Sequence, residues 1–305
     1  MDFLLEIAEF ALQAIIIVVA LLIIIGFIAS LVSKNKDSSK LKVKNLNKVH
    51  KQYRGALEGA ILDKKTLKRQ KKQDKKNDKN EEKKNTLFVL SFDGDIKASA
   101  TDQLREEISS VLLVAKPDDE VVLCLESPGG MVHGYGLAAS QLQRIKDRNL
   151  KLTVCVDKVA ASGGYMMACI ADKIISAPFA IIGSIGVVAS LPNFHRILKK
   201  NDVDYLEITA GEYKRTLTTL GEITEPGMNK FKSQIQDIHD LFKNHVKTQR
   251  PQLDLEKVAT GEYWYGQQAK DLQLVDEIGT SDDYLLRHEE SHRILRVTFK
   301  GKQSL

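Results

Sequence analysis

Apolar residues in this chain form one long run near the start and many short runs later. The long run, residues 10–32, is interrupted only by Gln13 and Ser30. A helix needs about 20 apolar residues to cross a bilayer, so this run predicts a single membrane anchor. A cleaved signal peptide is the alternative, but the run is too long for one, acidic residues precede it and no small-residue cleavage site is evident.

The stretch after the long run is strongly basic. Residues 33–85 hold 19 Lys and Arg against 7 Asp and Glu, whereas the whole chain has a net charge of +5. Basic residues beside an anchor attract anionic lipid headgroups and favour a cytoplasmic position for the residues that follow. The basic run at 71–84 has no interleaved aromatic side chains that could stack on bases, so we predict contact with membrane lipids and no nucleic acid.

The pattern divides the chain into an anchor at 1–33, a basic helical and flexible linker at 34–85, and a folded domain at 86–305. Within the linker, loosely helical spacing predicts a surface helix at 41–67, and residues 68–85 are too polar to pack. In the domain, short apolar runs alternate with helical patterns, which predicts an α/β fold with a largely parallel, buried sheet. The predicted strands are 87–92, 120–126, 151–156 and 173–176, and the predicted helices are 100–114, 132–146, 163–170 and 226–249.

A second apolar stretch at 174–192 could be mistaken for another membrane span. It contains Pro178, Gly183 and Gly186 and is rich in Ile and Val, so it predicts a buried strand and a turn. The tail from 263 onward predicts a short helix, a turn at 276–279 and a last strand at 292–299. These elements complete a single domain.

Two segments that follow predicted strands carry paired glycines. Gly129 and Gly130 follow the strand at 120–126, and Ser162 with Gly163 follows the strand at 151–156. Ligands gather at the carboxyl ends of parallel strands, where glycines let backbone N–H groups approach them. A tight turn would explain either glycine pair alone, whereas the two together, one of them beside a serine, favour a catalytic site.

Four segments of the chain resemble the signal peptide peptidase A family, and the resemblance is closest to its SohB branch. The segments are Ser127–Gly130, Ala161–Tyr165, Gly183–Val187 and Gly211–Lys214. The resemblance extends over residues 87–278. It implies a ClpP/crotonase-like domain with a parallel sheet backed by helices, and assembly into rings or domes.

The same resemblance implies a role for individual residues. Ser162 corresponds to the family's nucleophile, and Lys214, 52 positions later, corresponds to its general base. Ser184 corresponds to the serine that contacts this lysine. Together, Gly129, Gly130 and Gly163 would then donate N–H groups to the oxyanion, which needs donors about 3 Å away. One difference is that Met166 follows Tyr165, where many members have a second tyrosine.

Other residues could supply the base. A lysine must be neutral to accept a proton, which requires burial, so Lys214 should lie in a dry pocket, although its neighbour Arg215 is more typical of an exposed pair. Lys158 is closer to Ser162 in sequence, but it follows a strand end where exposure is expected. His133 could belong to a Ser/His/Asp triad, yet a polar residue on a helix explains it better.

These residues predict a serine endopeptidase with a Ser/Lys dyad, acting through an acyl-enzyme on signal peptide remnants or membrane-proximal proteins. A homo-oligomer is expected, in which the dyad could straddle two subunits. Localisation to the bacterial inner membrane follows from the anchor; the side of the membrane stays open, since the charges favour the cytoplasm and relatives are often placed in the periplasm. No metal or other cofactor is predicted, because neither the histidines nor the cysteines, Cys124, Cys155 and Cys169, have the spacing of a ligand set.

Two other function classes remain open. A crotonase-type acyl-CoA enzyme would use the same paired glycine donors and would be indifferent to Lys214. A catalytically silent membrane scaffold would keep the fold and would tolerate loss of Ser162.

Overall fold

The computed structural model describes residues 18–24, 41–69 and 84–300. In those ranges no helix combines the length and the apolar composition needed to cross a bilayer. The predicted anchor at 10–32 lies mostly outside them, and so does the predicted flexible segment at 68–85, although residues 18–24 are helical. The chain divides into a unit up to Lys42 and a larger one, Val43–Leu305, which holds both sheets described below apart from the first residues of the edge strand.

Seven strands form the main sheet, in the order β1-β10-β2-β3-β4-β6-β9. They are β1 (Leu41–Asn45), β2 (Thr86–Asp93), β3 (Glu120–Glu126), β4 (Lys151–Val156), β6 (Lys173–Ser176), β9 (Glu277–Ile278) and β10 (Arg293–Phe299). The pairs from β10 across to β9 are all parallel. In β2, four successive residues from Leu87 to Leu90 are buried, which is typical of a parallel strand covered on both faces.

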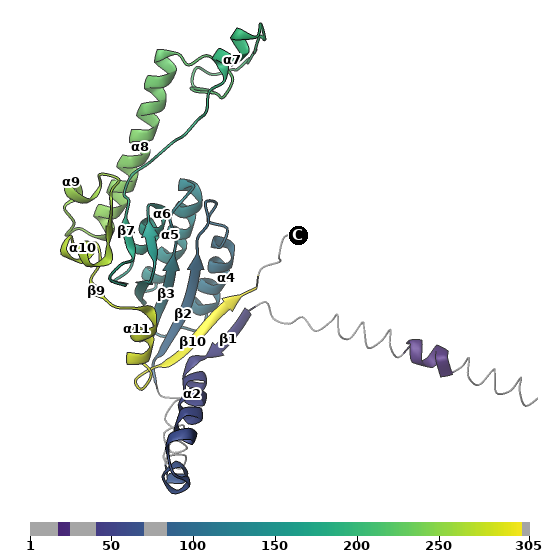
Figure 1. The fold of residues 1–305 in the computed structure, drawn as a ribbon, viewed down its shortest axis with the longest axis vertical. Coiled ribbons are helices and arrows are strands. Elements are labelled where there is room, and N and C mark those ends of the chain that lie inside the picture. Colours follow the sequence, from purple (N-terminus) through teal and green to yellow (C-terminus); the bar gives the residue numbers. More distant parts are fainter. Residues whose placement is uncertain (1–17, 25–40, 70–83, 301–305) are drawn as a thin grey trace, which may run out of the picture. The chain divides into compact units, whose positions relative to one another are not determined.

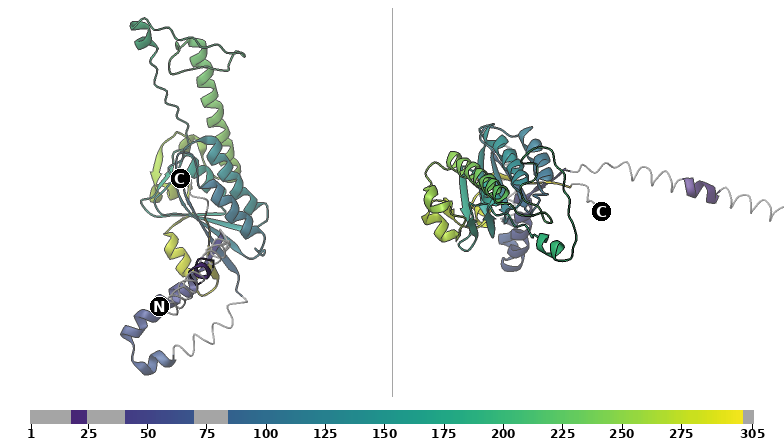
Figure 2. Two further views of the ribbon diagram at one scale, coloured as in Figure 1. Left: turned by 90° about the vertical axis from the view of Figure 1, so that its right-hand side faces the viewer. Right: turned by 90° about the horizontal axis from the view of Figure 1, so that it is seen from above.

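Helices cover both faces of this sheet, as Figures 1 and 2 show. On one face α4 (Thr101–Leu112) and α5 (Val132–Lys146) lie side by side. On the other, α11 (Ser281–Arg287) and the start of α2 (Leu46–Ile61) contribute to the core. That core is formed by Leu46, Leu87, Val89, Val122, Cys155, Ile175, Tyr284, Leu285 and Ile294.

A second, three-stranded sheet positions the site. It consists of β5 (Val159–Ala161), β7 (Ile181–Gly183) and β8 (Tyr263–Tyr265), with β5 and β7 parallel and β8 antiparallel to β7. The remaining helices are α6 (Gly163–Ala168), α7 (His195–Lys200), α8 (Glu225–Gln249), α9 (Leu255–Val258) and α10 (Gly266–Asp271).

The predicted α/β fold with a largely parallel sheet is confirmed. The strands expected at 120–126, 151–156 and 173–176 and the helix expected at 132–146 have those bounds in the structure. The stretch at 174–192 begins with the end of β6, a turn and β7, which confirms buried strand and turn up to Gly183, but residues 188–192 are exposed and form neither strand nor helix.

The prediction of one surface helix over 41–67 is wrong at both ends, because residues 41–45 form strand β1 at the edge of the main sheet and α2 ends at Ile61. Leu41 and Val43 alternate there with Lys42 and Lys44, a period of two that fits a strand. Lysines are common on edge strands, where they discourage pairing with another chain.

The first residues of α2 are tied to the end of the chain. The amide nitrogen Nδ2 of Asn47 donates to the backbone oxygens of Glu289 (2.9 Å) and His292 (3.0 Å), and its Oδ1 accepts the N–H of Ile294 at 2.7 Å. Both Leu46 and Asn47 are buried. Residues in front of Thr86 are therefore part of the packed domain.

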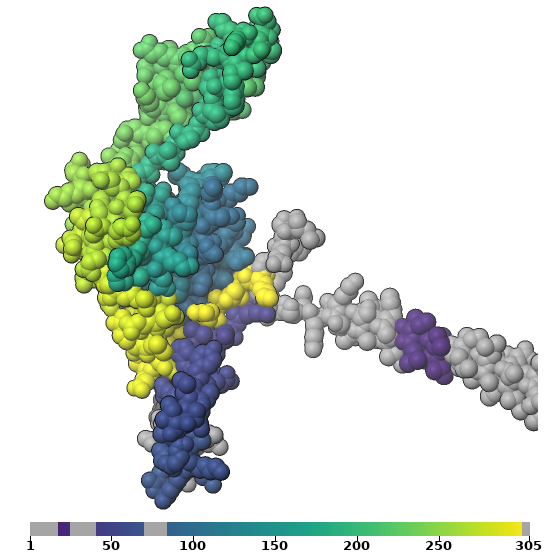
Figure 3. Space-filling view, in the orientation of Figure 1, coloured from purple at the N-terminus to yellow at the C-terminus, as the bar shows by residue number. Residues whose placement is uncertain are grey.

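Residues 188–224, here called the arm, lead from β7 to α8 and include α7. No residue of the arm is buried. Figure 3 shows the arm and the adjoining end of α8 standing clear of the sheets. Within the arm, the Phe194 N–H donates to the Thr219 oxygen (2.8 Å), and the Tyr213 ring faces Lys230 of α8 at 5.0 Å, so the arm is folded onto the start of that helix.

Candidate active site

Ser162 and Ser184 occupy equivalent positions on neighbouring strands. Ala161 of β5 is the register partner of Gly183 of β7, and each serine directly follows its partner residue. The Ser162 N–H donates to the Gly183 oxygen at 2.8 Å. Both serines have a positive φ, 52° and 51°, which is uncommon for residues other than glycine and frequent at functional sites.

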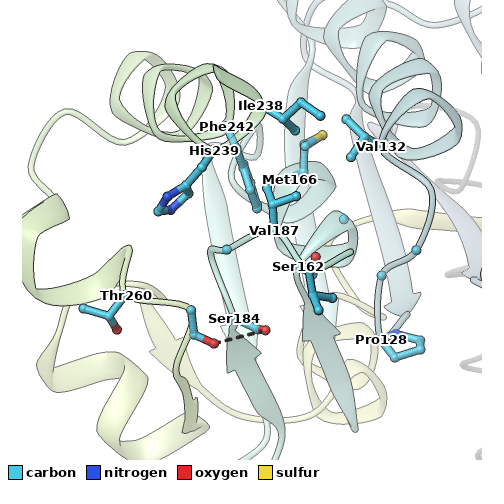
Figure 4. A pocket seen from close by; sticks show the side chains of 16 residues that line it. Pro128, Val132, Ser162, Met166, Ser184, Val187, Ile238, His239, Phe242 and Thr260 are labelled. Carbon is cyan, nitrogen blue, oxygen red and sulfur yellow. Dashed lines mark hydrogen bonds between the residues drawn. The ribbon is translucent and has the colours of Figure 1, made fainter. Parts of the chain in front are cut away.

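Both serines line a cavity of about 570 Å3. Figure 4 shows Ser162 at the centre of this cavity and Ser184 on the neighbouring strand, with its hydroxyl donating to the Gly261 oxygen at 3.4 Å. The other walls are supplied by the loop after β3, by α6, by the segment after β7 and by α8. The lining side chains are mostly apolar: Pro128, Val132, Met166, Val187, Val188, Ile238 and Phe242.

Ser162 is the residue just before α6, with φ 52° and ψ −118°. Ser162 is partly exposed, and its hydroxyl makes no hydrogen bond to any residue that the structure describes. A serine hydroxyl held on a strained turn, open to an apolar cavity, is placed to attack a bound carbonyl once a base is supplied.

The three predicted oxyanion donors meet beside Ser162. A Cβ on Gly129 would lie 2.7 Å from the Ser162 Cβ and 2.8 Å from the Gly163 nitrogen, so only glycine allows this approach. The Gly129 N–H already donates to Ser127 Oγ at 3.1 Å. The N–H groups of Gly130 and Gly163 have no partner among the described residues, and both glycines line the cavity. Two of the three amides are therefore free to bind an oxyanion.

Lys214 lies elsewhere. It is exposed, it belongs to the arm, and its N–H donates to the Gly211 oxygen at 3.1 Å. The cavity lining does not include it. Figure 1 shows α7, the neighbour of this loop, at the end of α8 that lies away from the sheets. Within one chain, the structure does not bring Lys214 to Ser162.

The rival bases do not face Ser162 either. Lys158 Nζ donates to both carboxylate oxygens of Glu126, at 3.0 and 2.9 Å. These hydrogen bonds raise the pKa of Lys158, which keeps its amine protonated and unfit as a base. His133 is exposed and lies outside the cavity lining.

His239 of α8 does line the cavity, and the sequence analysis did not single it out. Its Nε2 lies 3.2 Å from the Ile185 oxygen. In Figure 4 its ring lies on the far side of the cavity from Ser162. The helical spacing of Ile238, Phe242 and Val246 could have shown that this face of α8 turns inward, with His239 at its margin.

Comparison with known proteins identifies the family of this chain. The model of the N-terminal part of peptidase family S49 matches residues 2–142, and the family S49 model itself matches residues 144–295. A SohB relative from Buchnera aphidicola subsp. Baizongia pistaciae is 44% identical over 95% of this chain and 89% of its own length. The chain belongs to peptidase family S49.

Within family S49 the chain falls in the SohB branch. "Probable protease SohB" of Haemophilus influenzae is 62% identical over 73% of this chain, and the match spans 64% of that relative. A solved structure of a membrane-bound stomatin-specific protease, 1510-N, in complex with a substrate peptide aligns with a TM-score of 0.41 and 16% identity, covering 67% of this chain and 80% of its own. The predicted family and branch are therefore confirmed.

Proposed function

We propose that this S49 member is a serine endopeptidase in which Ser162 attacks the peptide carbonyl and Lys214 is the general base. The observation that carries the proposal is the placement of Ser162: a strained φ, an unpaired hydroxyl and two free backbone N–H groups around one apolar cavity. Attack would put negative charge on the carbonyl oxygen, and the N–H groups of Gly130 and Gly163 would stabilise it. The acyl-enzyme would then be hydrolysed by water.

The base would come from a second copy of the chain. The arm that carries Lys214 has no buried residue and exposes ten large apolar or aromatic side chains: Val188, Leu191, Phe194, Ile197, Val203, Tyr205, Leu206, Ile208, Tyr213 and Ile223. A surface of this kind is typical of a protein interface. An arm that packs against a neighbouring copy could deliver Lys214 to that copy's Ser162 and remove the amine from water, which favours its neutral form. Ser184 would then orient the amine.

The lining of the cavity indicates the substrate class. Apolar side chains such as Met166, Val187 and Phe242 favour an apolar residue next to the scissile bond. Together with an anchor at 10–32 in the bacterial inner membrane and lipid contacts of the basic linker, this supports signal peptide remnants or membrane-proximal proteins as substrates. The basic flank favours a catalytic domain on the cytoplasmic side.

The test compares the full-length chain, purified in detergent, with its Ser162→Ala and Lys214→Ala variants. We measure cleavage of a fluorogenic apolar peptide and labelling by a serine-reactive probe. Both variants should lose cleavage, and labelling should require Ser162. If all three proteins behave alike, the peptidase function is wrong, and turnover of an acyl-CoA thioester would then separate the crotonase-type enzyme from a silent scaffold. The full chain is needed because Asn47 is part of the packed domain.

A further inference from the structure

A chain of hydrogen bonds runs behind the loop that carries the free Gly130 amide. The Gly129 N–H donates to Ser127 Oγ at 3.1 Å, Ser127 Oγ lies 2.6 Å from Tyr135 Oη, and Tyr135 Oη donates to the Asp95 oxygen at 2.8 Å. The side chains of Ser127 and Tyr135 are fully buried. No solvent molecule can therefore easily replace either partner.

The donor and acceptor roles along this chain of hydrogen bonds are fixed. A phenol has a single proton, and that of Tyr135 is used on the Asp95 oxygen. Tyr135 must then accept the Ser127 proton, and Ser127 Oγ is left to accept the Gly129 N–H. Burial raises the pKa of Tyr135, which keeps the phenol protonated and the direction fixed.

This arrangement determines which amide of the loop is left without a partner. Because the Gly129 N–H is turned inward to Ser127, the peptide before Gly129 is held in place, and the next amide, that of Gly130, is left without a partner among the described residues. A Cβ on Gly130 would lie 2.2 Å from the Ile96 oxygen, so the loop also rests closely on the segment after β2.

The same tyrosine supports the second donor. A Cβ on Gly163 would lie 2.3 Å from Tyr135 Cγ and 2.6 Å from its Cδ2, so the ring packs directly against the residue that follows Ser162. The ring is itself held by an edge-on contact with Phe92, at 6.3 Å between centroids. One side chain of α5 thus contacts both halves of the predicted oxyanion site.

We propose that Tyr135 is a positioning residue: through Ser127 and Gly129 it sets the Gly130 amide, and through its ring it sets the Gly163 amide, for binding the oxyanion. This inference rests on the proposed peptidase function and adds to it a residue that touches neither substrate nor Ser162 Oγ. Its hydroxyl matters because an oxyanion donor that moves by a fraction of an ångström loses much of its effect on the transition state while substrate binding persists.

The experiment uses Tyr135→Phe and Ser127→Ala in the full-length chain, with Tyr284→Phe as the matched control. Tyr284 is also a buried tyrosine, but its hydroxyl donates to Glu120 at 2.6 Å, at the other end of β3. We measure kcat and KM on the fluorogenic peptide and inhibition by a peptide aldehyde, whose hemiacetal adduct with serine resembles the tetrahedral intermediate. We also measure the thermal midpoint and the hydrogen exchange of residues 127–131.

We expect Tyr135→Phe to lower kcat about 10- to 100-fold with KM changed less than about threefold, and to weaken the aldehyde by a similar factor. The Ser127→Ala variant should do the same, and the double variant should be no worse than the poorer single one, because both break one chain of hydrogen bonds. Exchange at 127–131 should quicken in these variants. The control should lower the thermal midpoint without changing kcat or the exchange of this loop.

An unchanged kcat in Tyr135→Phe, or an equal loss in Tyr284→Phe, would overturn the positioning role. Failure of the proposed function is distinguishable, since the wild type would then neither cleave the peptide nor bind the aldehyde. In that case, faster exchange at 127–131 in Tyr135→Phe alone would still support control of this loop by Tyr135. Unchanged exchange would reject it.

Discussion

Mixing two inactive variants tests whether the active site is shared between subunits. One variant, Ser162→Ala, keeps the lysine, and the other, Lys214→Ala, keeps the nucleophile. Neither variant should be active alone, because each lacks one of the two proposed catalytic groups. Lys214 is exposed on the arm and absent from the cavity lining of its own chain, so a mixed oligomer can place an intact Lys214 of one copy beside an intact Ser162 of another. Activity should therefore return on mixing.

The size of the recovery follows from counting neighbours. In a random equimolar oligomer, half of the subunits keep Ser162 and half of their neighbours keep Lys214, so about one quarter of the sites are complete. A second mixture, wild type with the Ser162→Ala/Lys214→Ala double variant, separates the two models further. A shared site leaves about one quarter of full activity there, whereas a site within one chain leaves about one half.

The assay needs oligomers of known composition. The two variants are co-expressed with different affinity tags, isolated by both tags in succession, and tested for cleavage and for probe labelling of the subunit that keeps Ser162. Two differently tagged copies of Ser162→Ala form the negative control. The reasoning is refuted if doubly tagged, intact oligomers are as inactive as either parent, or if the second mixture keeps half of the activity.

Three further predictions concern stability and the rival base. Burial raises the pKa of Glu107 to about 7, above its unfolded value, so the folded state loses stability as pH rises from about 4.5 to 7. In urea titrations, Glu107→Gln should therefore gain up to about 3 kcal/mol of unfolding free energy at pH 8 and nothing near pH 4. The exposed control Glu106→Gln should show no such gain. Asn47→Ala should lose about 3 kcal/mol of unfolding free energy in urea, because three hydrogen bonds to the end of the chain disappear. The control Asn201→Ala, at an exposed position, should change the unfolding free energy by less than about 0.5 kcal/mol. Equal losses in the two variants would contradict the role of Asn47 in the domain. Lys158→Ala should keep kcat within about threefold, and a loss like that of the nucleophile variant would reinstate it as the base.

The sequence predicted those elements whose pattern is local and long enough to repeat. The strand at 120–126 is an apolar run between two glutamates, and the strand at 151–156 is an apolar run that starts at a lysine and is interrupted only by Thr153. Near-continuous apolar runs of this kind are typical of buried parallel strands. By contrast, β5 and β8 have three residues each, too few to show a period. Strand β1 was missed because its five residues were included in the helical spacing that continues into α2.

The sequence predicted only those parts of the candidate site that are formed by residues close together along the chain. Ser162 and the glycines were found because the backbone chemistry needs them in that order. The role of Tyr135 was not visible, since its hydroxyl donates to the Asp95 oxygen, 40 positions earlier in the chain. His239 could have been placed only at the margin of the inward face of α8, because its contact with the Ile185 oxygen joins segments distant in sequence. In a sequence, a tyrosine on an amphipathic helix indicates only a core position; the structure is needed to show the hydrogen-bond partner of its hydroxyl.

Lys214 shows a different limit. A spacing of 52 positions specifies how many residues separate two groups along the chain, but not whether they meet in the same molecule. Here Ser162 and the predicted oxyanion donors are positioned by two sheets, whereas Lys214 lies on an arm that has no buried residue. If a neighbouring copy completes the site, an isolated subunit has a positioned serine and no base. Peptide cleavage would then be confined to the assembled enzyme, which protects other proteins from a lone subunit.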